Sequence, residues 1–246
     1  MLAEKPLSSG HLNGVNGVNG VNGQYKRSSL SNVIKPCFAS REEAGELLAI
    51  LLKYYAQKEN TIVLSIKPTA TLLAYELAKE LKLPLDLFLI RTLKIDGLTI
   101  GAITDRTDNP LQNEQIIRGC DITQQQLSEI VNQERIQLET LKHQFNPPNY
   151  PLSNSENATV LLATDGIQTG QNARCAIRLL KSMGYRGRIV LVAGVIGSDA
   201  QKIFMREADE VIAVKGPQNV GLVSSWYQNE EPTNEQIKQA LLKAKE

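Results

Sequence analysis

The chain has 246 residues, of which 42% are hydrophobic and 22% are charged, and this composition is typical of a globular protein with one large domain or two small ones. Its formal net charge of +1 gives no indication of a nucleic-acid partner or an acidic membrane surface. Three cysteines without a CxxC pair and two histidines argue against a zinc site, a disulfide framework and a histidine-dependent triad, so we expect a cytoplasmic protein without a metal site of its own.

The N-terminal part, residues 1–34, is predicted to be a disordered low-complexity tail. It contains the repeat NGVNGVNGVNG, and no alternating strands flank it as an Asn-Gly hairpin requires. The first residues lack the apolar segment of a signal peptide, and the longest uncharged apolar run, residues 189–197, is too short to span a bilayer. We therefore expect no membrane partner, and a folded domain over residues 35–246.

Helices and strands alternate along this domain. Ser40 and Glu43 predict a capping box before the helix EEAGELLAILLKYY, which leads to the strand TIVLSI and the helix TLLAYELAKEL. LDLFLI and LTIGAIT are predicted strands, DNPLQNEQ a loop, and the segment after Thr123 a long helix that ends at NPPNYP. The strands TVLLAT, RIVLVAGV and EVIAV then alternate with two helices, and Thr233 caps a terminal helix. This alternation predicts an α/β fold with a parallel sheet flanked by helices.

The junction after TVLLAT carries the clearest functional signal. Asp165 closes the strand, DGIQTG forms the turn, and a helix begins just after Gly170. Glycines let backbone amides approach an anion, the start of a helix supplies free N–H groups, and Thr169 and Asn172 add side-chain donors. The turn matches neither GxxxxGK[ST] nor GxGxxG, which argues against nucleotide hydrolysis and dinucleotide binding. It predicts a site for a sugar phosphate, with the alternative that Asp165 and Thr169 simply cap a turn.

TVLLATDGIQTGQNARCAIRLLKSMG resembles the PRPP-binding motif of type I phosphoribosyltransferases, in which a hydrophobic strand leads into Asp-Asp-Gly-Ile-x-Thr-Gly-x-Thr. FASREEAGELLAILL, LLAYELAKELKLPLDLFLIRTL, LTIGAIT, LQNEQIIRG and SSWYQNEEPTNEQIKQALL resemble further segments of stand-alone bacterial members of that family. The resemblance covers the chain from about Phe38 onward. It implies a twisted parallel sheet flanked by helices, with a small hood from the terminal segments.

The resemblance also implies a reaction and its residues. Pyrophosphate is displaced from PRPP by a base that the sequence does not identify, with Mg²⁺ on the diphosphate. Asp165, beside Thr164, would hold the ribose hydroxyls and support the positive charge that builds on the sugar. The residues implied for the 5′-phosphate are Gly166, Gln168, Thr169, Gly170, Gln171 and Asn172. Those implied for the pyrophosphate side are Lys67, Thr69, Ala70 and Arg91.

Several of these positions depart from the family pattern. Thr164 stands where the family has an acidic residue, and Lys67 to Ala70 replace a Pro-Arg-Gly-Gly loop. The sequence therefore leaves three hypotheses open. The chain is a phosphoribosyltransferase, or a protein that binds PRPP or another ribose 5-phosphate compound without transfer, or an interaction protein without a ligand. The oligomeric state is also open, a homo-oligomer included.

Overall fold

Five parallel strands form the main sheet in the computed structural model, which describes residues 37–245. Their order is β2–β1–β6–β7–β8, with β1 at Thr61–Ser65, β2 at Leu85–Leu87, β6 at Thr159–Ile167, β7 at Arg188–Ile196 and β8 at Glu210–Lys215. Every residue of β1 and β6 is buried, which explains why both read as continuous apolar runs. The tail predicted for residues 1–34 lies outside the described residues.

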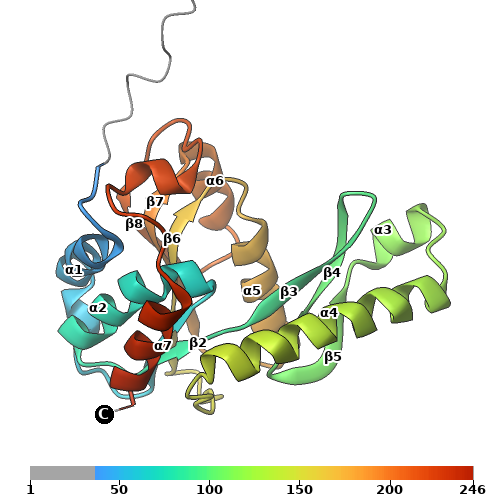
Figure 1. Ribbon diagram of the computed structural model, residues 1–246, viewed down its shortest axis with the longest axis horizontal. Coiled ribbons are helices and arrows are strands. Elements are labelled where there is room, and N and C mark those ends of the chain that lie inside the picture. Colours follow the sequence, from blue (N-terminus) through green and yellow to red (C-terminus); the bar gives the residue numbers. More distant parts are fainter. Residues whose placement is uncertain (1–36, 246) are drawn as a thin grey trace, which may run out of the picture. The chain divides into compact units, whose positions relative to one another are not determined.

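Helices cover both faces of this sheet (Figure 1). Alternate strand residues such as Leu161 and Val190 pack under the first layer, which contains α1 (Arg41–Leu51), α2 (Thr71–Leu81) and α7 (Asn234–Lys243). Their neighbours, among them Val160 and Ile189, pack under α5 (Gln171–Ser182) and α6 (Ser198–Phe204) on the opposite face. The predicted α/β fold, a parallel sheet flanked by helices, is confirmed.

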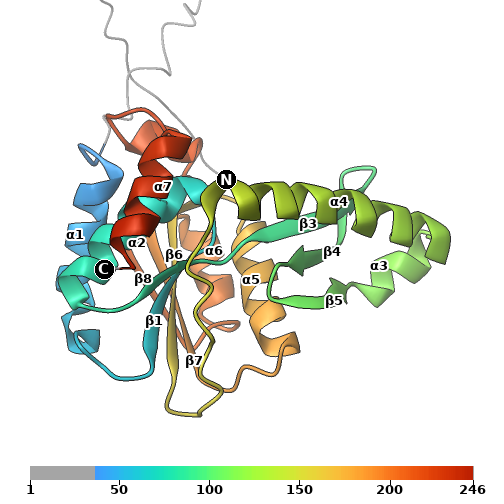
Figure 2. The same ribbon diagram turned by 60° about the horizontal axis from the view of Figure 1, so that its bottom comes forward.

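A second, antiparallel sheet stands beside the main one. It contains β3 (Ile90–Ile95), β4 (Leu98–Thr104) and β5 (Thr107–Gln112), followed by α3 (Glu114–Gly119) and α4 (Gln124–Phe145). Figures 1 and 2 both show α4 running along this sheet, where α4 packs mainly against β3. Because α5 also contacts β3 and β4, the second sheet lies against the helix that follows the DGIQTG turn.

Two strand predictions in this region are wrong in detail. The run LDLFLI was predicted as one strand, but β2 ends at Leu87 and β3 begins at Ile90, so the chain passes there from one sheet to the other. DNPLQNEQ was predicted as a loop, yet β5 includes its residues from Asp108 to Gln112. Pro110 is tolerated there because β5 is an edge strand and its register against β4 is irregular.

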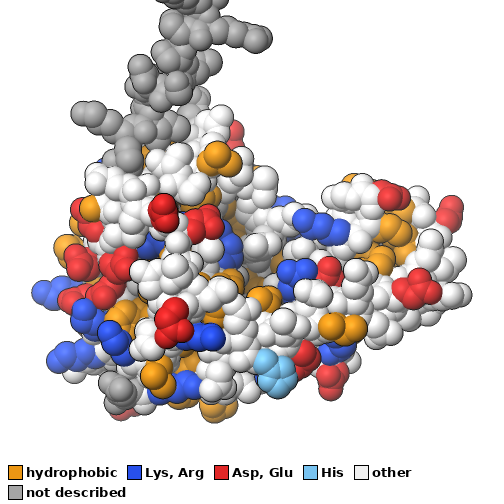
Figure 3. All heavy atoms as spheres, in the orientation of Figure 1, with side chains coloured by type: hydrophobic (Ala, Val, Ile, Leu, Met, Phe, Trp, Pro, Cys, Tyr) orange, Lys and Arg blue, Asp and Glu red, His pale blue; other side chains and the backbone are white. Residues whose placement is uncertain are grey.

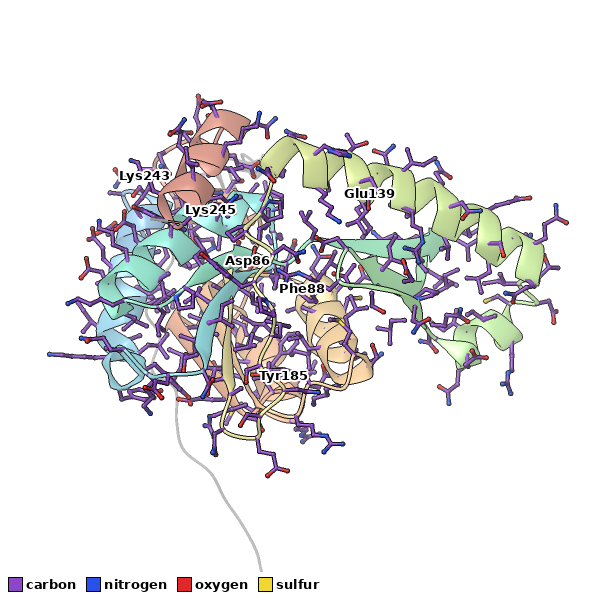
Figure 4. The ribbon with its side chains drawn as sticks, turned by 90° about the horizontal axis from the view of Figure 1, so that it is seen from below. Asp86, Phe88, Glu139, Tyr185, Lys243 and Lys245 are labelled. Atoms are coloured by element: carbon purple, nitrogen blue, oxygen red, sulfur yellow. The ribbon has the colours of Figure 1, made fainter. Side chains whose placement is uncertain are left out.

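The junction between the sheets is fixed by a buried carboxylate. Asp86 in β2 is fully buried, accepts from the Arg106 guanidinium at 2.7 Å, and accepts from the Tyr150 backbone N–H at 2.7 Å. Figure 4 shows Asp86 and the nearby Phe88 at the centre of the view, between the two sheets. A charge-assisted hydrogen bond at this depth holds the second sheet in one position.

The segment at the start of the described chain lies beside the segment that precedes α7. Phe38 forms a parallel bridge with Tyr227, and the Gln228 N–H donates to the Phe38 carbonyl at 3.0 Å. The capping boxes that begin at Thr123 and Thr233 are both complete. That at Ser40 is half formed, because the Glu43 carboxylate accepts from the Ala39 N–H instead. Among the described helices, none has the length and apolar character that crossing a membrane requires.

Candidate functional site

A cavity of about 190 Å³ lies at the carboxyl end of β6, where the chain turns into α5. All six residues implied for the 5′-phosphate line this cavity, together with one residue from the pyrophosphate side. Its polar lining consists of Lys67, Thr164, Gly166, Gln168, Thr169, Gly170, Gln171 and Asn172. Ligands of open parallel sheets bind at this edge, so the fold and the sequence motif indicate the same place.

The turn depends on two glycines. Gly170 caps the start of α5 with φ +74°, and a Cβ added there would come within 2.5 Å of the Phe204 ring. A Cβ on Gly166 would come within 2.6 Å of Val223 Cγ1. Both positions therefore need glycine, the first for its backbone conformation as well as for space.

The loop presents unpaired backbone donors to the cavity. The first backbone bond of α5 runs from the Arg174 N–H to the Gly170 carbonyl at 2.9 Å. Within the described part of the chain, the N–H groups of residues 168–173 donate to no backbone or side-chain acceptor. The macrodipole of α5 adds partial positive charge at the same point, so the loop is suited to hold one phosphate.

Asp165 is not open to this cavity. Strand β6 continues two residues beyond Asp165, so the sequence-based expectation that the strand ends there is wrong. The Asp165 side chain is 3% exposed, and its oxygens lie 2.8 Å from Lys67 Nζ and 3.4 Å from Arg41 Nε. The Thr69 hydroxyl donates to the same carboxylate at 3.3 Å, and the Gly166 N–H at 3.0 Å. Both oxygens of the carboxylate therefore already have hydrogen-bond or ion-pair partners within the protein.

The alternation of β6 explains this arrangement. Successive side chains of a strand point to opposite faces, so Thr164 lines the cavity while Asp165 points toward α1. Lys67 lies between the cavity and the buried Asp165 carboxylate, because it lines the cavity and pairs with Asp165. The cavity lining contains no carboxylate, and two cations face the single buried charge of Asp165. The local charge balance favours an anionic ligand.

Arg41 and Tyr227 support Asp165 from the terminal segments. The Arg41 side chain is 1% exposed and its guanidinium lies 4.5 Å from the centre of the Tyr227 ring. The Tyr227 hydroxyl donates to the Asp165 backbone carbonyl. Burial is the main cause that raises the pKa of Tyr227, and the negative charge of Asp165 raises it further. The positive charge of Arg41 lowers this pKa by less, so the hydroxyl keeps its proton. Arg41 could not be predicted as a site residue, because no local pattern distinguishes it from the other polar positions of α1.

The remaining residues of the pyrophosphate side are not at the cavity. Ala70 is fully buried at the start of α2, where the short 3₁₀ helix Pro68–Ala70 ends. Arg91 lies in β3 and pairs with Glu134 of α4 at 2.6 Å, so it does not line the cavity. No group of three or more His, Cys, Asp or Glu side chains among the described residues could hold a metal ion.

The comparisons with known proteins agree with the motif. The chain is 27% identical over 197 residues to two Mycobacterium tuberculosis proteins named "Putative phosphoribosyl transferase", Rv0571c of strain H37Rv and MT0597 of strain CDC 1551. The match covers 78% of this chain and 43% of those relatives, so the chain spans less than half of their length. No family model matches the sequence.

Among solved structures, the protein TT1426 from Thermus thermophilus aligns with a TM-score of 0.71 at 24% identity, covering 84% of this chain and 98% of that chain. This match shows a shared fold. A hypoxanthine phosphoribosyltransferase from Staphylococcus aureus aligns with a TM-score of 0.40 at 17% identity over 72% of this chain and 73% of that chain. The similarity to the mycobacterial proteins confirms the resemblance of this chain to phosphoribosyltransferases.

Proposed function

We propose that the chain binds the ribose 5-phosphate group of PRPP or of a related phosphoribosyl compound in the cavity of residues 166–172. The observation that carries this proposal is the run of unpaired N–H groups from residue 168 to residue 173, at a helix start and opposite the Lys67 ammonium. Backbone amides in this arrangement bind a phosphate whatever the neighbouring side chains are.

Asp165 has a positioning role in this proposal. Its carboxylate holds Lys67 Nζ at 2.8 Å, and the buried Arg41 compensates the charge of Asp165 from the other side. Lys67 is therefore held at the edge of the cavity, where its ammonium can meet an anionic ligand. This role replaces the direct contact with ribose hydroxyls that the family resemblance implied.

Transfer of the phosphoribosyl group is expected to be slow or absent. Positive charge develops on the sugar during such a reaction, and the neutral Thr164 faces the cavity where the family has a carboxylate. Loss of one preorganised charge-stabilising group typically costs about 3–4 kcal/mol, or a hundred- to a thousandfold in rate. We therefore favour a binding or regulatory protein over an efficient enzyme.

A second candidate, phosphoribosyl transfer, is favoured by the position of Lys67. This side chain is 28% exposed and lies between Asp165 and the cavity. A diphosphate that attracts the ammonium would release one carboxylate oxygen of Asp165 toward the ligand. No carboxylate lines the cavity in the structure, so in this candidate Mg²⁺ would enter with the diphosphate of PRPP.

Thermal-shift titration with PRPP, with and without Mg²⁺, tests the binding proposal. A ligand at a hundredfold its dissociation constant stabilises a protein by about 2.7 kcal/mol, which is measurable. Lys67→Met should reduce the stabilisation by PRPP. The matched control Lys79→Met removes an exposed lysine paired with Glu76 and should leave it unchanged.

A pyrophosphate-release assay with several bases separates the two candidates. Binding without release supports the binding protein, and release that disappears in Lys67→Met supports transfer. Absence of any saturable effect of PRPP or ribose 5-phosphate on the wild-type protein would refute both.

A further inference from the structure

A second cavity, of about 380 Å³, lies between α5 and the antiparallel sheet. Thr169 and Gln171 line both this cavity and the phosphate cavity, so the two meet at the loop. The other lining residues come from one face of α5 and from β4, β5 and the residue that follows β5. We call this cavity the α5 groove. On the face seen in Figure 3, the surface is hollowed between the two sheets, with Lys and Arg side chains at the edges of the hollow.

The α5 groove is basic. Arg174 and Arg178 line it, and no acidic residue does. Arg174 pairs with Glu207 at 2.9 Å, whereas Arg178 is exposed and forms no ion pair within the described residues. Cys175 also lines the groove. Burial raises the pKa of its thiol by more than the two arginines lower it, so the thiol adds no negative charge.

The spacing of the arginines fits a group next to the loop phosphate. Residues four apart lie on one face of a helix, and each residue advances about 1.5 Å along the axis. Gln171 lies in the first turn of α5. The Cα atoms of Arg174 and Arg178 thus lie about 5 Å and about 10 Å farther along the helix axis. Helical side chains lean toward the N-terminus of their helix, so both arginine side chains extend from these Cα positions back toward the loop. A second phosphate attached to the one in the loop would come within reach of their guanidiniums.

One side-chain contact lies across the place where the α5 groove meets the cavity of residues 166–172. The Gln171 side-chain amide donates to the Thr99 hydroxyl across the groove, and both residues line it. Gln171 is exposed, so its side chain can rotate aside when a ligand enters. Thr99 and the backbone of β4 would then form the wall opposite the arginines.

We propose that the α5 groove receives a second phosphate joined to the 5′-phosphate, so that the preferred ligand is a ribose 5′-diphosphate compound. This inference rests on the proposed function, because it requires the first phosphate to occupy the loop. It assigns to the second sheet a role in ligand selection, since β4 and β5 supply one wall of the groove. A 5′-monophosphate fills the loop and leaves the groove to solvent.

Calorimetric titration of ADP and AMP, both without divalent cations, tests this assignment. The two probes share adenosine and the first phosphate and differ in the second phosphate. The wild-type protein should bind ADP at least about tenfold more tightly than AMP, a difference of about 1.4 kcal/mol. Arg178→Gln should abolish that preference and leave the affinity for AMP unchanged. The control Arg118→Gln removes an exposed arginine of α3 and should preserve the preference.

The different failures are distinguishable. If AMP and ribose 5-phosphate bind but ADP has no advantage, or if Arg178→Gln weakens AMP and ADP equally, the inference about the groove is wrong while the proposed function stands. If none of the three compounds binds, both are wrong.

Discussion

Replacing Asp165 by Asn tests the view that this carboxylate supports the site from within the protein. The substitution removes the only charge within 4 Å that compensates Arg41 in the described residues, and the Arg41 side chain is 1% exposed. Breaking a buried ion pair by removing one partner costs about 3–5 kcal/mol. Lys67 is 28% exposed and can be solvated, and Arg41 keeps its contact with the Tyr227 ring. We therefore expect the lower end, about 3 kcal/mol.

Urea denaturation gives this free energy directly, and a thermal melt should show a decrease in Tm of about 6–12 °C for a domain of this size. Arg41→Met combined with Asp165→Asn should recover part of the loss, because the uncompensated charge is then gone. A loss below about 1 kcal/mol in the single variant, a value typical of an exposed ion pair, would refute the reasoning.

Two further predictions concern groups outside the phosphate loop. Tyr227→Phe leaves the buried Asp165 carbonyl without its hydroxyl donor and should cost about 1–3 kcal/mol in urea denaturation, whereas Tyr185→Phe, which loses a bond of 3.5 Å, should cost less. Burial raises the pKa of Glu210, but hydrogen bonds from Arg188 and two tyrosine hydroxyls outweigh it, so the net pKa is lowered from 4.5. A carboxyl group whose pKa is lower in the folded than in the unfolded protein stabilises the fold at pH values above its unfolded-state pKa. This stabilisation is lost as the pH falls through the folded-state pKa, so Glu210→Gln should make the stability less dependent on pH below about 4.5. Unchanged pH profiles in that variant would contradict the assignment.

Most of the main sheet could be predicted from the sequence. Strands such as TIVLSI and TVLLAT are buried on both faces and read as continuous apolar runs between amphipathic helices, which is the pattern of a parallel sheet. The loop after Asp165 could also be located, because its glycines and the helix that follows leave a recognisable local signature. Thr164, Gly166 and the residues from Gln168 to Asn172 line one cavity in the structure.

The parts that could not be predicted depend on contacts between distant residues. Arg41 reaches Asp165 across 124 positions of the sequence, and neither residue has a local pattern that indicates the pair. LDLFLI is divided between two sheets, and the buried Asp86–Arg106 pair at that junction also joins separate segments. Arg91 was expected near the ligand, but its ion pair with Glu134 holds it against α4.

The direction in which the Asp165 side chain points could not be predicted from the motif either. The motif indicated that Asp165 would face the sugar, yet the alternation of β6 directs Thr164 into the cavity and Asp165 toward Arg41. The register of a strand against its neighbours decides which side chain faces a ligand, and that register comes from the whole sheet.

Calorimetry with ribose 5-phosphate shows whether the loop of residues 166–172 holds the phosphate of a ribose 5-phosphate compound. The variants are Gly170→Ala and its matched control Gly184→Ala. Both glycines have positive φ, so both substitutions strain the backbone, but a Cβ on Gly184 meets no atom within 4 Å. We expect saturable binding in the wild type and in Gly184→Ala, and at least a tenfold weaker affinity in folded Gly170→Ala. Equal affinity in the two variants, or no binding in the wild type, would contradict phosphate binding by this loop.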